Sequence, residues 1–469
     1  MSILRQWFGD FTKEELKKYV LLGIIFALII GIYWTLRPLK DALFQDMVGA
    51  TWQPRAKWLS LLVMAVLVPT YSWLVGKLKR QTLFYLLSGI YGTLALVFAG
   101  FMFSKTFGLE LPADPSRILG WAWYVYVESF GSLIVALFWA FAADISTDES
   151  AKRGFSLIVM IGQLGGIAGP GILTKIPKWF SISNAYPVLI CGGLIFLIIP
   201  LIRYFISTMP RHELESFHGK NEKEVEKDEA HEPGFFEGLK LLVSQPYLLG
   251  IFAVVTFYEI IVTVFDYYFK TWVDAQILDK ALKSAYLGDY ALYANLATFL
   301  CLLFGISNIT RRLGVTVSLG IVPLVVAAAT LIFRNYTTMT SLFWLMVGAK
   351  GINYALNGPA LKQLYVPTTK DTRYKAQAWI ESFGSRGAKA AGSGLNDLHK
   401  NVLVWKNGPQ WADKAFSKAN VFGPNDLGSF WYIVMTSYLF FGIIAVWFFV
   451  ALYLGRTYQK AANEKRVIC

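Results

Sequence analysis

The chain has 469 residues, of which 55% are hydrophobic and only 16% are charged, and its mean hydropathy is +0.46. A soluble domain carries about a quarter charged residues, so this composition excludes a soluble globular protein and indicates a polytopic helical membrane protein. The net charge of +13 does not indicate nucleic-acid binding, because Lys and Arg collect at the cytoplasmic ends of membrane helices.

Apolar windows long enough to cross a bilayer recur along the whole chain. A spanning helix needs about 20 mainly apolar residues, and about twelve windows meet this requirement. They lie at 19–37, 58–78, 82–104, 119–143, 154–175, 185–206, 246–269, 288–309, 313–334, 341–364, 376–397 and 428–455. Residues 1–18 precede them and read as an amphipathic cytoplasmic segment lying against the membrane.

A polar, charge-rich linker at 208–245 divides these windows into two halves of six, at 19–207 and 246–456. Short basic turns follow every second window, which predicts that both termini and the linker are cytoplasmic. Residues 399–427 then form an external loop, and 457–469 form a cytoplasmic tail. Two six-helix halves around a cytoplasmic linker are typical of a major-facilitator-like transporter, whose site lies at the membrane midplane.

Charged side chains intrude into the apolar windows, although each costs about 3 kcal/mol at the bilayer centre. In the first window, Trp34, Arg37 and Lys40 are spaced by three and share a helix face, and Pro38 is expected to kink the helix. Arg and Lys there suit phosphate binding. The alternative is that both side chains snorkel to the outer interface.

Acidic residues occupy two further windows. Glu128 lies deep in the fourth window, where it either pairs with a neighbouring helix or acts in gating or proton coupling. In the seventh window, Asp266 and Lys270 are four apart and can pair along the helix, and Glu259 shares the face of Asp266.

The tenth and eleventh windows are the most polar. Lys350, Asn353 and Asn357 form one stripe, and Gly358-Pro359 is expected to break the helix. The other polar and aromatic residues of interest in this region are Lys362, Tyr365, Glu381, Arg386 and Lys389. Asn and Ser side chains also join membrane helices, but that role does not explain so many Lys and Arg residues.

Enzyme chemistry finds no support in the sequence. The four His residues are in or beside loops, the three Cys residues have no paired spacing, and no P-loop motif is present. We therefore expect no catalytic residue, metal or cofactor, and transport driven by exchange or by an ion gradient.

Several segments resemble the nucleotide transporter family, the ATP/ADP translocase type of obligate intracellular bacteria and plastids. Leu36-Arg37-Pro38-Leu39-Lys40-Asp41-Ala42-Leu43-Phe44 is similar to its first-helix signature, and Tyr126-Val127-Glu128-Ser129-Phe130-Gly131-Ser132 to its fourth-helix motif. The stretches from Tyr354 to Pro367 and from Asp371 to Gly394 resemble its tenth- and eleventh-helix region.

The resemblance implies nucleotide exchange, typically of ATP for ADP, with functional roles for Lys40, Glu128 and Asp266, the last standing where the family has Glu. The family's Lys after the tenth-helix Pro falls on Leu361 here, with Lys362 next to it. A shift of one residue turns a helical side chain by about 100°. This departure bears on strict ATP/ADP exchange more than on nucleotide transport.

The sequence therefore predicts a nucleotide transporter of the bacterial inner membrane, monomeric and working by alternating access. The expected phosphate-binding residues are Lys40, Arg37, Lys362, Lys270, Lys350 and Lys389. The expected gating or coupling residues are Glu128, Asp266, Glu259 and Glu381. Asn353 and Asn357 are expected to line the path, and the base-stacking candidates are Trp34, Tyr124, Tyr258 and Tyr365. The alternatives are a proton-coupled importer of nucleotides or another organic anion, and a membrane scaffold that transports nothing.

Overall fold

The computed structural model contains helices and no strands across the residues that it describes. These residues are 11–78, 80–146, 148–210, 240, 242–303, 307–336, 338–365, 367–368, 379–380, 384–403, 427–464 and 468. Residues 1–10, most of the linker, Glu381 and most of the external loop, which figure in the predictions above, lie outside this part of the chain.

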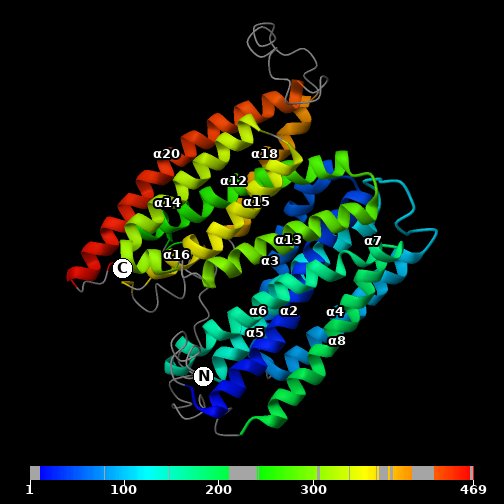
Figure 1. Ribbon diagram of the computed structural model, residues 1–469, viewed down its shortest axis with the longest axis horizontal. Coiled ribbons are helices and arrows are strands. Elements are labelled where there is room, and N and C mark those ends of the chain that lie inside the picture. Colours follow the sequence, from blue (N-terminus) through cyan, green and yellow to red (C-terminus); the bar gives the residue numbers. More distant parts are fainter. Residues whose placement is uncertain are drawn as a thin grey trace. The chain divides into compact units, whose positions relative to one another are not determined.

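The helices follow the predicted windows (Figure 1). Their bounds are α2 (Lys13–Met47), η1 (Ala50–Trp52), α3 (Gln53–Lys77), α4 (Arg80–Phe103), α5 (Ile118–Asp144), α6 (Asp148–Leu173), α7 (Ile176–Phe180), α8 (Ala185–Thr208), α12 (Pro246–Gln276), α13 (Lys280–Leu303), α14 (Ser307–Asn335), α15 (Met339–Ile352), η2 (Asn353–Asn357), α16 (Gly358–Leu364), α18 (Ser385–Leu403) and α20 (Leu427–Glu464). Among the described residues, 8 helices are long and apolar enough to cross a membrane. The remaining windows coincide with helices that are shorter or more polar, namely α3, α13, α15 to α16, and α18. The prediction of an all-α membrane protein is confirmed.

The chain divides into two compact units that do not coincide with the two sequence halves. Unit 1 comprises Met1–Trp52, Leu62–His231 and Asp274–Leu296. Unit 2 comprises Gln53–Leu61, Glu232–Val273 and Ala297–Cys469. The start of α3 therefore packs with the carboxy-terminal half, and the start of α13 packs with the amino-terminal half.

Helix α2 extends well past the expected end at residue 37. Its start is fixed by a capping box, in which the Thr12 hydroxyl accepts a hydrogen bond from the Glu15 backbone and the Thr12 backbone N–H donates one to the Glu15 carboxylate, both 3.1 Å long. The helix continues through Pro38 to Met47. The polar residues Lys40, Asp41 and Asp46 therefore lie inside the helix and are buried, which a hydropathy window does not reveal.

Unit 1 is held together by close packing of α2 against α6, which lie side by side, as do α4 and α8 (Figure 1). A β-carbon at Gly165 would overlap the carbonyl oxygen of Ala27, and one at Gly169 would overlap that of Gly31. Small residues allow membrane helices to approach this closely, so the glycines of α6 determine its distance from α2.

Replacing Gly165 with alanine is expected to destabilise unit 1 by about 2 to 3 kcal/mol, because the new methyl group meets backbone that cannot yield. Thermal melting of the detergent-solubilised protein measures the effect. Gly193→Ala is the matched control, since its β-carbon would have no neighbour within 4 Å. Equal melting temperatures for the two variants would contradict this packing.

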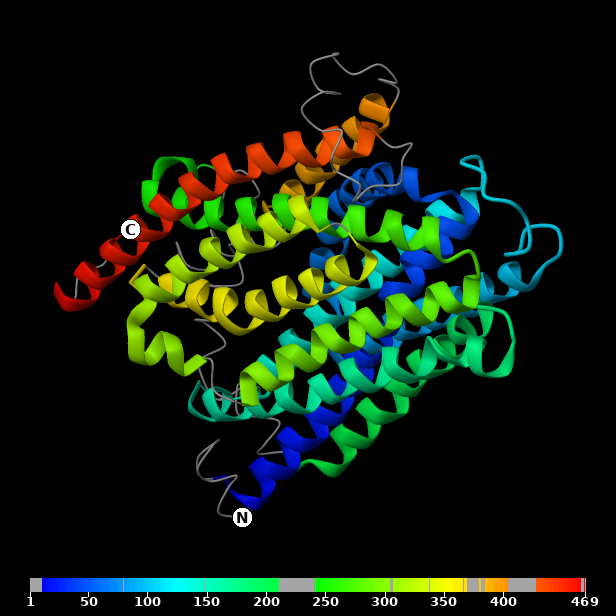
Figure 2. The same ribbon diagram turned by 45° about the horizontal axis from the view of Figure 1, so that its top comes forward.

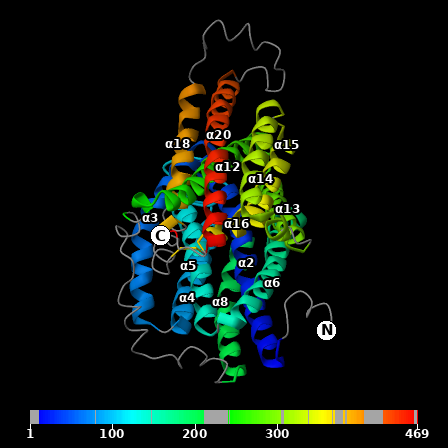
Figure 3. The ribbon, with the colours of Figure 1, turned by 90° about the vertical axis from the view of Figure 1, so that its left-hand side faces the viewer.

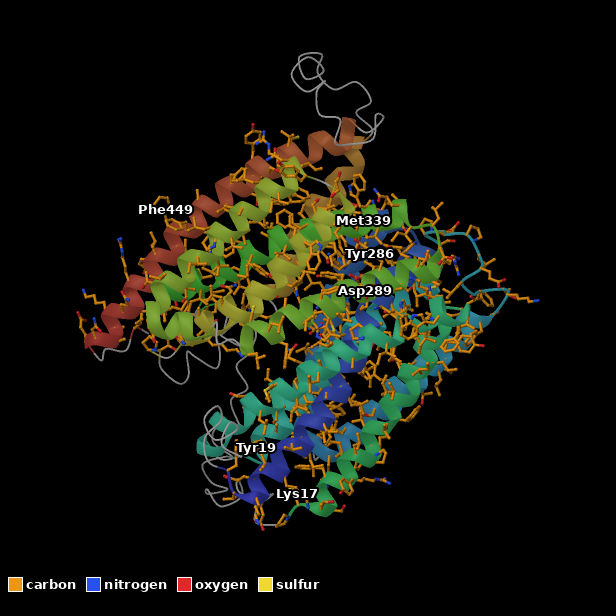
Figure 4. All side chains as sticks on the ribbon, in the orientation of Figure 1. Lys17, Tyr19, Tyr286, Asp289, Met339 and Phe449 are labelled. Atoms are coloured by element: carbon orange, nitrogen blue, oxygen red, sulfur yellow. The ribbon has the colours of Figure 1, made fainter. Side chains whose placement is uncertain are left out.

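In unit 2, α14 and α20 run side by side, and α18 contacts α20 (Figures 2 and 3). Large apolar side chains on this unit point outward. Phe449 projects from α20 (Figure 4) and is 70% exposed. On a membrane protein such a surface faces the lipid.

The expected break at Gly358-Pro359 takes the form of a wide turn. Helix α15 passes into the π-helix η2, and α16 begins at Gly358 with Pro359 in its first turn. Proline fits the first turn because the missing N–H has no intrahelical partner there. Single π turns inside helices are frequent at functional sites.

Candidate functional site

Lys40 lies at the centre of an ionic cluster between α2 and α5 in unit 1. Its Nζ donates to Glu128 Oε1 at 2.7 Å, lies 3.2 Å from Asp41 Oδ1, and sits 3.9 Å from the centre of the Tyr124 ring. Lys40 is 4% exposed, whereas the Glu128 side chain is 40% exposed. The Lys40 ammonium is thus buried, whereas its partner Glu128 is exposed enough to move away from it.

The charge of this cluster limits how it can bind an anion. One ammonium serves two carboxylates, so these three groups together carry a negative charge. A phosphate reaching Lys40 must therefore replace Glu128, because adding it beside both carboxylates would bring three anions together. This exchange of partners gives Glu128 a physical basis for the gating role expected of it.

Arg37 lies one turn before Lys40 and is surrounded by aromatic rings. Its guanidinium sits 5.1 Å from the centre of the Trp34 ring, and it donates a hydrogen bond to the Tyr33 hydroxyl at 3.3 Å. Trp34 is only 8% exposed. The cation–π contact positions Arg37 while leaving it charged.

In unit 2, lysines converge on Asp266. Lys270 Nζ is 2.6 Å from Asp266 Oδ2, which confirms the pairing expected from their spacing. Lys57, from the start of α3, is 3.6 Å from the same oxygen. Lys350 of α15 is 8% exposed and also acts electrostatically on Asp266.

A second ionic contact in unit 2 joins α12 and α18. Lys389 Nζ lies 3.6 Å from Glu259 Oε1, and the Ser385 hydroxyl donates to the same oxygen at 3.2 Å. Two of the predicted site residues on different helices are therefore neighbours. Arg386 is half-buried on α18, and Lys362 is exposed on α16.

The polar residues of η2 are joined to each other. Asn357 donates from its side-chain nitrogen to Asn353 Oδ1 at 2.9 Å, and Asn357 is 2% exposed. The two side chains thus act as one amide pair within the π turn.

The aromatic candidates are covered by protein. The Tyr124 ring is 1% exposed and lies between Lys40 and Phe44, whose ring centre is 5.3 Å away. Tyr258 is 3% exposed and donates to the Ala349 carbonyl at 3.1 Å, and Tyr365 is also 3% exposed. A base can stack on any of these three rings only after neighbouring side chains move.

Sequence reasoning missed a buried ionic cluster in unit 1. Lys283 Nζ of α13 lies 2.8 Å from Asp46 Oδ1 of α2 and 2.5 Å from Asp274 Oδ1 of α12. Nearby, Lys175 pairs with Asp289 at 2.6 Å, and Figure 4 shows Asp289 on α13. The predicted window begins at residue 288, whereas α13 begins at Lys280, so its charged first turns lie outside the window.

Within the described residues, no group of three His, Cys, Asp or Glu side chains is placed to hold a metal ion. The polar side chains brought together are mainly lysines facing carboxylates on neighbouring helices. Such pairs can exchange one partner for a phosphate group without any covalent step.

Comparisons with known proteins bear on the fold and the family of the chain. Solved structures of similar fold include a bacterial homologue of the human lysosomal transporter Spinster, in an inward-facing conformation, with a TM-score of 0.59 and 15% identity, covering 96% of this chain and 99% of that chain. A mutant of the nucleoside transporter NupG aligns with a TM-score of 0.60 and 14% identity, covering 93% of this chain and 99% of that chain. At these identities the likeness concerns the fold, which is major-facilitator-like.

The relatives found by sequence identify the family to which the chain belongs. ADP,ATP carrier protein 1, chloroplastic, of Arabidopsis thaliana is 26% identical over 81% of this chain and 67% of its own length. ADP,ATP carrier protein 1 of Rickettsia prowazekii (strain Madrid E) is 24% identical over 99% of this chain and 98% of its own length. Residues 1–114 and 118–348 match the family described as TLC ATP/ADP transporter. With the match extending over most of the chain, this protein belongs to the TLC ATP/ADP transporter family, a family of membrane transporters and not of enzymes.

Proposed function

We propose that this protein exchanges adenine nucleotides, ATP against ADP, across a membrane by alternating access. The observation that carries the proposal is Lys40, a buried ammonium held by a half-exposed carboxylate on another helix. A nucleotide phosphate can take the place of Glu128 and keep the ammonium compensated. Arg37, one turn before Lys40 on the same helix, supplies further positive charge for the remaining phosphates. Phosphate-binding roles for Lys270, Lys350, Lys389 and Lys362 remain part of the proposal.

In this proposal the ion pairs of Glu128 and Asp266 break and reform during the transport cycle. A buried ammonium left without a partner is expensive, so the empty carrier must restore each pair before it changes conformation. A carrier that is stable only with either a carboxylate or a phosphate on Lys40 favours exchange of one nucleotide for another.

The basic turns of the sequence support a cytoplasmic location for both termini. We infer that orientation, and with it we propose a monomeric protein of the bacterial inner membrane. Lys13 and Lys17 at the start of α2 then lie at the cytoplasmic surface, and the connection between α2 and α3 lies on the outer side.

A proton-coupled import of nucleotides is the second candidate. It is favoured by the exposure of Glu128, whose side chain is 40% exposed and can exchange protons with water. Protonation of Glu128 would release Lys40 for the phosphate, and the proton would travel with the substrate.

Uptake of labelled ATP into proteoliposomes distinguishes the two candidates. Exchange predicts that ADP inside the vesicles raises the initial rate about tenfold or more, because the loaded carrier returns faster than the empty one. A proton uncoupler should then have no effect. If internal ADP does not change the rate and the uncoupler abolishes uptake, the protein is a proton-coupled importer and the exchange proposal is wrong. If no uptake occurs under any condition, both candidates are wrong.

A further inference from the structure

We infer that Lys57 is a further phosphate-binding residue, one that the amino-terminal half contributes to the lysine cluster around Asp266. The inference rests on the proposed nucleotide transport. Lys57 lies in the second turn of α3, and its ammonium is 3.6 Å from Asp266 Oδ2, the oxygen that Lys270 holds at 2.6 Å.

The two distances assign different roles to the two lysines. A charge-assisted N–H to carboxylate bond is about 2.7–2.9 Å long, so Lys270 is the direct hydrogen-bonded partner of Asp266, and Lys57 makes a longer electrostatic contact with the same oxygen. A phosphate oxygen can therefore bind Lys57 while Lys270 keeps its bond to Asp266.

Because the cluster is shielded from water, its ammonium groups favour a ligand with several negative charges. The side chains of Lys57, Lys270 and Asp266 are 16%, 7% and 14% exposed, so water screens them poorly. Ammonium groups crowded at one carboxylate repel each other, and a polyphosphate chain with several negative charges relieves that repulsion.

Lys57 lies close to the start of its helix, whereas Asp266 lies well inside α12. Lys57 is about 6 Å along the axis from the first residue of α3, and Asp266 is about 15 Å from the last residue of α12. Lys57 belongs to the amino-terminal half of the sequence, and Asp266, Lys270 and Lys350 belong to the carboxy-terminal half. All four residues lie in unit 2, so Lys57 is the contribution of the amino-terminal half of the sequence to a cluster within one compact unit.

The main alternative is that Lys57 merely fastens α3 to α12. Arg55 offers a matched control for that role, since it lies two residues before Lys57 on α3 and its Nε is also 3.6 Å from a carboxylate oxygen, that of Asp397. The Arg55 and Asp397 side chains are 51% and 39% exposed, so this pair contributes little energy.

The test compares Lys57→Gln, Lys57→Arg and Arg55→Gln in proteoliposomes, with melting temperatures measured on the same preparations. Inhibition of labelled ATP uptake by unlabelled ATP, ADP, AMP and inorganic tripolyphosphate is measured for each. Lys57→Gln is expected to weaken inhibition by ATP and tripolyphosphate about tenfold, and inhibition by AMP much less, because the lost ammonium served the terminal phosphates. Lys57→Arg should stay close to wild type, as should Arg55→Gln.

The results that would overturn the inference are the following. Equal weakening for ATP and AMP, or unchanged inhibition with a lowered melting temperature, would show a structural role and overturn the inference. Weakened inhibition by tripolyphosphate but not by ATP would assign the cluster to inorganic phosphates and overturn it as well. If the wild-type protein takes up no nucleotide, the proposed function is wrong. Because the wild type is measured alongside the variants, this result is distinguished from a failure of the inference about Lys57.

Discussion

Replacing Lys40 with alanine is expected to lower the initial rate of ATP uptake about 100-fold, because the variant loses the charge-assisted hydrogen bond from Lys40 to a phosphate, a loss of about 3 kcal/mol. Lys40 is 4% exposed and is held by Glu128 at 2.7 Å. The measurement is uptake of labelled ATP into proteoliposomes loaded with ADP.

Loss of folding must be separated from loss of binding in this variant. Without Lys40, Asp41 and Glu128 face each other without the shared ammonium, so the variant will also melt at a lower temperature. Adding Glu128→Gln should restore part of the melting temperature and none of the uptake. Lys178→Ala, which removes an exposed lysine of α7, is the control and should transport normally. Uptake by Lys40→Ala equal to that control would contradict the proposed role.

Replacing Lys283 with alanine is expected to lower the free energy of unfolding by about 3 to 5 kcal/mol, the cost of leaving buried charges without their partner. Lys283 bonds Asp46 at 2.8 Å and Asp274 at 2.5 Å. The Lys283 and Asp46 side chains are 6% and 2% exposed, so water cannot replace the ammonium. Thermal and denaturant unfolding in detergent measure the loss.

The Lys175–Asp289 pair provides the contrast for this prediction. Its distance of 2.6 Å is as short, but its side chains are 25% and 34% exposed, so Lys175→Ala should cost at most about 1 kcal/mol. The double variant Lys283→Ala, Asp46→Asn should recover much of the stability lost by the single one. Equal losses for Lys283→Ala and Lys175→Ala would show that burial is not what makes the Lys283 cluster important.

Local patterns accounted for the parts of the site that lie within one helix. The pairing of Asp266 with Lys270 follows from their spacing of four, and the departure from α-helix before Pro359 follows from the chemistry of proline. The composition predicted an all-helical membrane protein. For Glu128, the expectation of a partner on a neighbouring helix was one of two alternatives, and the structure identifies that partner as Lys40.

Contacts between distant segments were beyond sequence reasoning. Lys57 and Lys283 lie just before apolar windows, where charged residues usually face water. In the structure α3 and α13 begin earlier, so that Lys57 is largely covered and Lys283 is buried. The pattern does not predict a role for Asp46, because α2 continues past Pro38 as far as Met47. Periodicity reports on one helix at a time, whereas these pairs depend on which helices pack together.

The most direct test of the central claim is competition between nucleotides and the corresponding nucleoside. If buried lysines bind the cargo through its phosphates, unlabelled ADP should inhibit uptake of labelled ATP by wild-type proteoliposomes, and adenosine at the same concentration should not. Inhibition by adenosine as strong as that by ADP would mean that the base and sugar are recognised without the phosphates, which would contradict the role assigned to Lys40 and the Asp266 cluster.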